Sequence, residues 1–116
     1  MQLVIPELKR LVSSDLDFGK QPFDASDCEI YCEVEIGVKG EQGADIFFFT
    51  VATPKFLLRQ QGYRWGRGYL LVDSFSWEIV EAAVKKLLSY CSGNNWDEVA
   101  KKLNMALDWE FDNYQE

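Results

Sequence analysis

The sequence predicts an α+β fold, a twisted and mainly antiparallel sheet of about four strands with helices packed on one face. Three observations support this fold class. Residues 28–38 alternate between apolar and polar side chains, residues 46–52 form a nearly unbroken aromatic and β-branched run, and two stretches after residue 76 repeat apolar residues at helical spacing. The expected order of elements is βββαβαα. Residues 1–116 are expected to form a single domain, since the length is close to the commonest domain size.

Residues 44–62 form the centre of the predicted fold. A strand there runs directly into a short helix, for which Thr53 supplies an N-cap hydroxyl and Pro54 suits the first helical position. The sheet is expected to grow outward from residues 47–49, three consecutive phenylalanines. Of these, Phe48 is predicted to face the helices.

Residues 28–38 carry the clearest strand pattern of the chain. One set of alternating residues is apolar and is expected to face the helices: Cys28, Ile30, Cys32, Val34, Ile36 and Val38. A turn at 40–43, with two glycines, would pair this strand with the central one as an antiparallel hairpin. Two further strands are expected, over 69–73 and over 2–12. The latter is placed near a sheet edge because Pro6 cannot donate to a ladder.

Residues 13–27 are polar and predict a long loop, a type of connection that often carries function. Its apolar residues Leu16, Phe18 and Phe23 are expected to hold it against the body of the protein.

The C-terminal part predicts two helices and an anchored tail. Ser76 and Asn95 are the expected N-caps, each followed by acidic residues that suit the positive end of a helix. The tail aromatic residues, Trp109 and Phe111, are expected to pack back on the body because aromatic side chains bury a large area.

Composition excludes several classes of partner and site. The net charge of −7 disfavours nucleic acid and anionic membrane, since phosphate binding needs a basic surface. No apolar run approaches the roughly 20 residues that a membrane span needs. The N-terminal residues lack the basic region of a signal peptide, so a cytoplasmic protein is expected.

The three cysteines are expected to be reduced and buried. Cys28 and Cys32 would lie roughly 13 Å apart on one strand face, beyond disulfide reach, which leaves them and Cys91 as free thiols. The chain has no histidine, so neither a zinc site nor the usual catalytic triads are expected. No cofactor is predicted.

Two motifs suggest chemistry and are better explained by structure. Glu33 and Glu35 would stand roughly 6–7 Å apart, within the range of glycosidase carboxylates, but glutamates are common on surface strands. The stretch 64–69 mixes arginine with aromatic residues, as single-strand nucleic-acid binders do. Two arginines in an acidic protein make a weak binding groove, and Trp65 is expected to cap the core.

The acidic residues of 11–36 are the strongest candidate for a binding site. Seven acids stand there against Lys20 alone. A neighbouring strand could neutralise them through Lys9 and Arg10, or they could attract a basic protein. With an aromatic anchor, the predicted partner-binding residues are Asp15, Asp17, Asp24, Asp27, Glu29, Tyr31, Glu33 and Glu35. Rival binding regions are 59–67 and the acidic tail.

Five stretches together resemble the immunity protein 8 family. They are Thr50-Val-Ala-Thr-Pro-Lys-Phe-Leu57, Arg67-Gly-Tyr-Leu-Leu-Val-Asp73, Trp77-Glu-Ile-Val-Glu81, Asn95-Trp-Asp-Glu-Val-Ala-Lys-Lys-Leu103 and Trp109-Glu-Phe-Asp-Asn-Tyr114. The resemblance covers nearly all of the chain and is weakest over 13–27. It implies a cytoplasmic α+β protein of a bacterial polymorphic-toxin or contact-dependent inhibition system, one that neutralises a cognate toxin from a neighbouring gene.

The resemblance carries no catalytic motif, so the expected function is non-catalytic binding of a toxin protein with a basic surface, for example a nuclease. Two alternatives remain open from the residues themselves. One is a non-catalytic adaptor for another protein partner, and the other is a small carbohydrate-active or hydrolytic enzyme.

Overall fold

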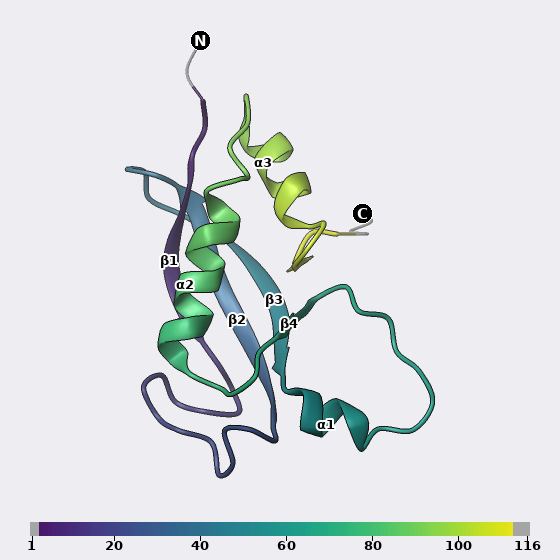
Figure 1. Cartoon of the computed structure of the whole chain (residues 1–116). Coiled ribbons are helices and arrows are strands. Elements are labelled where there is room, and N and C mark those ends of the chain that lie inside the picture. The colour runs from purple at the N-terminus through teal and green to yellow at the C-terminus, as the bar shows by residue number, and fades with distance from the viewer. Residues whose placement is uncertain (1–2, 113–116) are drawn as a thin grey trace.

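A computed structural model, which describes residues 3–112, shows an α+β fold in which two helices cover one face of a five-stranded sheet (Figure 1). The elements in chain order are β1 (Pro6–Val12), β2 (Glu29–Val38), β3 (Asp45–Ala52), α1 (Pro54–Leu58), β4 (Tyr69–Leu71), α2 (Trp77–Leu88), α3 (Trp96–Leu103) and β5 (Asp108–Trp109). The predicted fold class and order of elements are confirmed, with β5 as an additional short strand.

β3 is the central strand of the sheet. β2 pairs antiparallel with one side of it, and β1 continues the sheet as the outer neighbour of β2. Two short strands share the other side of β3. β4 runs parallel to residues 50–52, and β5 runs antiparallel to residues 47–48. The sheet is therefore mixed, with a parallel pair where the chain returns from α1.

The alternation of β2 is confirmed, and its register shows which side of β3 faces the helices. Cys32 and Val34 are fully buried, and they stand opposite Phe49 and Phe47, which are also buried. The prediction for Phe48 is wrong, because this side chain lies half-buried on the other face. Because aromatic side chains occupy both faces of β3, its sequence lacks the usual alternation of apolar and polar residues. Only the register of the hairpin shows which side chains face the helices.

The prediction that Thr53 caps α1 with its hydroxyl is also wrong. Thr53 is fully buried, and its Oγ1 accepts a hydrogen bond from the N–H of Cys28 at 3.0 Å. The hydroxyl thus joins the end of β3 to the residue before β2. Pro54 does occupy the first position of α1, as predicted.

The two longer helices begin at the predicted N-caps. Ser76 Oγ accepts from the N–H of Ile79, and Asn95 Oδ1 accepts from the N–H of Glu98. α2 buries Trp77, Val80, Val84 and Leu88, whereas α3 buries Val99, Ala100 and Leu103. These side chains meet the apolar faces of β2 and β3 in one core.

The loop 13–27 is held to the body partly as predicted. Leu16 packs against the core, and the Phe18 ring lies 5.0 Å from the ring of Trp77. The Trp77 indole also donates a hydrogen bond to the carbonyl of Lys20. Phe23 is fully exposed, so its predicted anchoring role is wrong.

Trp109 packs back on the sheet, as predicted, whereas Phe111 contacts Trp109 but stays 45% exposed. The Trp109 ring stacks on Phe47 at 6.3 Å, and Phe111 meets Trp109 edge-on at 5.8 Å. Tyr114, part of the quoted tail motif, lies outside the described residues.

Candidate protein-binding surface

The sheet face turned away from α2 and α3 forms the candidate site, and we call it the open face. Alternation and strand register place the following side chains on it: Arg10, Val12, Tyr31, Glu33, Glu35, Ile46, Phe48, Thr50, Tyr69 and Asp108. α2 and α3 both lie on the opposite side of the sheet (Figure 1).

The open face is ordered in rows across the strands. One row joins Tyr31, Thr50 and Tyr69. The next row joins Glu33, Phe48 and Asp108. The rings of Tyr31 and Phe48 lie 6.0 Å apart, and 45% of Tyr31 is exposed. An aromatic strip between carboxylates is thus available to a partner.

Tyr31 keeps its phenolic proton more firmly than a free tyrosine. Burial raises the pKa of its hydroxyl above the ordinary value, and the carboxylates of Asp108 and Glu33 raise the pKa further. At neutral pH the phenol is protonated, as an ordinary tyrosine is, and it is a hydrogen-bond donor on an acidic surface.

The predicted aspartates of the loop serve mainly to fix local structure. Asp15 Oδ2 accepts a hydrogen bond from the backbone N–H of Tyr31 at 2.8 Å. Asp24 accepts from both the N–H and the hydroxyl of Ser26, which lowers the pKa of this carboxyl. Asp27 forms an ion pair with Arg59 at 2.5 Å.

The glutamates of β2 differ in how far they are neutralised. Glu29 pairs with Arg64 at 3.0 Å, and Glu35 lies 3.8 Å from Arg10. Within residues 3–112, Glu33 forms no ion pair with a lysine or arginine. Glu33 therefore leaves one uncompensated charge in the middle of the open face.

The expectation that β1 supplies two compensating cations is half correct. Arg10 takes this role, but the Nζ of Lys9 contacts Glu7 and the carbonyl of Glu41 instead. The register of β1 against β2 shifts between Leu8 and Arg10, so Lys9 stands outside the regular alternation.

A hollow of about 380 Å³ lies where β1, β2 and the loop 13–27 meet, and it brings together three of the predicted residues, Asp17, Tyr31 and Glu33. Phe18 and Arg10 also line it. Glu35 does not line it, so the two glutamates do not share this hollow. Asp24 and Asp27 lie elsewhere, near Arg59.

Comparison with known families identifies the chain. The family model described as immunity protein 8 matches residues 7–114. The chain belongs to the immunity protein 8 family. No match is found among curated proteins or among solved structures.

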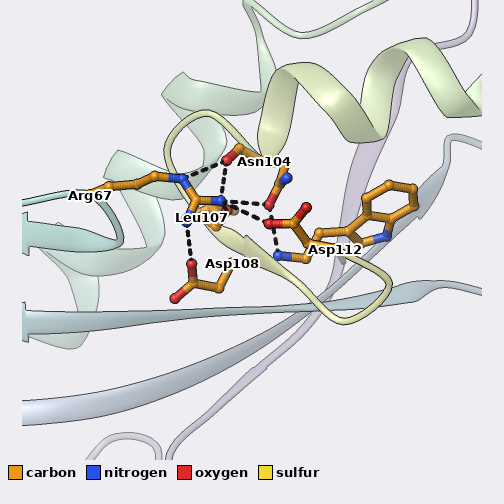
Figure 2. A network of polar contacts seen from close by, with 6 residues as sticks. Arg67, Asn104, Leu107, Asp108 and Asp112 are labelled. Carbon is orange, nitrogen blue, oxygen red and sulfur yellow. Dashed lines mark hydrogen bonds and ion pairs between the residues drawn. The ribbon is translucent and has the colours of Figure 1, made fainter. Parts of the chain in front are cut away.

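The matched range of this immunity protein 8 chain includes the open face and the segment before β4, where sequence reasoning missed a structural role. Arg67 joins that segment to the C-terminal part of the chain (Figure 2). Its guanidinium donates to the carbonyl of Asn104 at 2.6 Å, to Asn104 Oδ1 at 2.8 Å and to Asp108 Oδ1 at 2.7 Å. Asp112 lies 3.6 Å away.

Trp65, in the same segment of the immunity protein 8 chain, is 84% exposed. The prediction that it caps the core is therefore wrong. Phe48, Tyr69 and Asp108 were also absent from the predicted site. Only the strand register brings them onto the open face, since their own sequence context does not indicate a side of the sheet.

Two further properties concern the described residues of the immunity protein 8 chain. Between residues 3 and 112, no group of three or more acidic or cysteine side chains is arranged to hold a metal ion. In the same range, no helix has both the length and the apolar character to cross a bilayer.

Proposed function

We propose that this chain is an immunity protein that binds a cognate toxin domain in the cytoplasm and neutralises it by protein contact, without catalysis. The observation that carries the proposal is the open face, considered together with membership of an immunity family. A sheet face that neither α2 nor α3 covers presents aromatic rings between carboxylates, as protein-binding surfaces do.

Charge favours a basic partner. The chain carries a net charge of −7, and the hollow beside Tyr31 contains Asp17 and Glu33, neither of which forms an ion pair within residues 3–112. A complementary positive surface would approach this region faster than a neutral one. We infer that the open face and its hollow contact the toxin.

A nuclease fits this partner best. The substrate site of a nuclease is cationic because it must hold phosphates. A row of carboxylates can occupy such a site as the phosphates would. The proposed contact set keeps the predicted residues and is centred on Asp17, Tyr31 and Glu33, which line the hollow. Asp15, Glu29 and Glu35 are its nearer members, whereas Asp24 and Asp27 lie apart, near Arg59.

The test is co-expression with the toxin encoded beside this gene, followed by affinity measurement. The Glu33→Lys/Glu35→Lys protein should bind the toxin domain at least about tenfold more weakly, with a nearly unchanged melting temperature. Its association rate should also depend less on salt, because surface steering is screened within about 8–10 Å.

A matched control is the Glu41→Lys/Glu78→Lys protein, which makes the same change in net charge outside the open face. Glu41 lies in the hairpin turn and Glu78 in α2, both exposed. Its affinity should stay close to that of the wild type. Equal loss in both variants would indicate a general charge effect. Unchanged affinity of the Glu33→Lys/Glu35→Lys protein, with full protection of cells, would move the site elsewhere.

A further inference from the structure

The segment 59–68, between α1 and β4, extends away from the sheet as a wide loop, which we call the projecting loop (Figure 1). It carries two of the most exposed aromatic side chains of the described structure, Tyr63 at 89% and Trp65 at 84%. Leu58, directly before the loop, is 85% exposed. Three large apolar side chains therefore lie close together in sequence and in contact with water.

The arginines of the projecting loop are each paired with an acid of this chain. Arg59 pairs with Asp27. Arg64 donates to Glu29 Oε2 at 3.0 Å and to the hydroxyl of Tyr69 at 2.8 Å. Surface loops usually present charge to water and bury apolar groups. Here the charged groups are bound to the chain itself, and the apolar groups are left outside.

These contacts also fix the ends of the loop. Arg67 holds its last turn to Asn104 and Asp108 (Figure 2). Arg64 holds its middle to the rows of the open face. A loop fixed in this way loses less conformational freedom when a partner covers it, so more of the contact energy appears as affinity.

We propose that Trp65 and Tyr63 are aromatic anchors that insert into an apolar pocket of the toxin domain, beside the acidic open face. This deepens the proposed function and rests on it. Tryptophan and tyrosine are the residue types that most often dominate binding energy. Arg64 connects the loop to Glu29 and Tyr69, so the anchors and the carboxylates belong to one continuous surface.

Charge complementarity specifies the chemistry of the partner. The loop's three arginines are all paired with acids of this chain, whereas Glu33 has no paired cation between residues 3 and 112. The partner surface should therefore combine an apolar pocket for Trp65 with a basic border that faces Glu33.

The experiment measures affinity for the toxin domain encoded beside this gene. Trp65→Ala should bind at least about 30-fold more weakly, the change that corresponds to about 2 kcal/mol, and Tyr63→Ala should also bind more weakly. Tyr90→Ala is the matched control, because Tyr90 is 71% exposed and follows α2, far from the loop in sequence. It should bind as the wild type does. All three variants should keep the wild-type melting temperature.

Quenching of tryptophan fluorescence by acrylamide gives a second readout. Of the four tryptophans, Trp77 is buried and Trp96 and Trp109 are partly buried, so Trp65 should account for the readily quenched emission. The toxin domain should protect this emission, and Trp65→Phe should remove it from the free protein.

The outcomes distinguish failure of the aromatic anchor from failure of the proposed toxin-binding function. Toxin binding by the wild type, with Trp65→Ala within about threefold of it, would overturn the anchor and leave the proposed function standing. Failure of the wild type to bind would overturn both. A concentration-dependent dimer that Trp65→Ala abolishes would assign the loop to self-association and overturn the anchor.

Discussion

The indole Nε1–H of Trp109 donates a hydrogen bond to Oδ2 of Asp45 at 3.0 Å, across 64 positions of sequence. The indole of Trp96 donates to the same oxygen at 2.7 Å. A single carboxylate at the start of β3 therefore holds the first residue of α3 and the last residue of β5. An apolar residue at position 45 would remove this acceptor from both indoles.

Replacing Asp45 should therefore destabilise the fold. We expect Asp45→Leu to lower the free energy of unfolding by about 1–3 kcal/mol, because two partly buried donors lose their acceptor. Asp45→Asn keeps an acceptor oxygen and should lose less. Denaturant melts of the two variants test this, and a Leu variant as stable as the wild type would contradict the role of Asp45.

Phe47 and Phe48 should differ sharply although they are neighbours. Phe47 is fully buried between β3 and the helices, so Phe47→Ala should cost about 3–5 kcal/mol of unfolding free energy. Phe48 lies on the open face, and Phe48→Ala should cost about 1 kcal/mol. A larger loss for Phe48 than for Phe47, in the same denaturant series, would mean that the register of the hairpin is wrong.

Arg67 should stabilise the link between the projecting loop and the C-terminal part of the chain. Arg67→Ala removes donors to Asn104 and Asp108, and we expect a loss of about 1–2 kcal/mol. Arg67→Lys should recover only part of it, since an ammonium cannot form the same fork of contacts. Amide hydrogen exchange should accelerate over 66–71 and 104–109 in the Ala variant. Arg10→Ala, at a single weaker ion pair, should leave that exchange unchanged.

The stability of the protein should fall at alkaline pH, partly because of Cys32. Burial raises the pKa of this thiol from 9.0 to about 12. The unfolded thiol therefore loses its proton first, so the stabilising contribution is complete below pH 9 and is lost as pH rises toward 12. The slope should reach about 1.4 kcal/mol per pH unit.

The variant Cys32→Ala isolates this contribution from lysine and tyrosine titration. Its unfolding free energy, measured between pH 7.5 and about pH 10.5, should decline less steeply than that of the wild type. Parallel slopes in the two proteins would contradict the raised pKa of Cys32. Slow thiol labelling of native Cys32 is expected from its burial, whereas Cys28, which was also expected to be buried, is only partly buried and should label faster.

The sequence predicted those features correctly that depend on residues close together in the chain. The alternation of β2 reports burial directly, and the caps at Ser76 and Asn95 need only a side chain and the next turn of backbone. The predicted orientation of β3 was wrong because both of its faces bear large apolar side chains. The predicted capping role of Thr53 was wrong because its hydroxyl accepts a hydrogen bond from Cys28, which directly precedes the neighbouring strand β2. No local sequence pattern indicates that contact.

In the candidate site, too, local sequence patterns indicate some residues, and only long-range contacts indicate the others. Glu33 and Tyr31 were found because they share one face of an alternating strand. Asp108 and Tyr69 join them only through pairing with β3, and Arg64 and Arg67, on either side of Trp65, bind the distant acids Glu29 and Asp108. Such long-range partners are absent from any short stretch of sequence.

The pairing of β5 with β3 also has a consequence for synthesis on the ribosome. Directly after β5, the N–H of Glu110 donates to the carbonyl of Ile46, and Glu110 Oε2 accepts from the N–H of Ile46, across 64 positions. At about 5–20 residues per second, that separation corresponds to roughly 3–13 s of translation. During this interval, residues 46–48 have been synthesised but β5, which pairs with them, has not. The backbone there is therefore an unpaired strand edge of the kind that promotes aggregation. The nascent chain therefore carries this unpaired edge from translation of the hairpin until Trp109 is added.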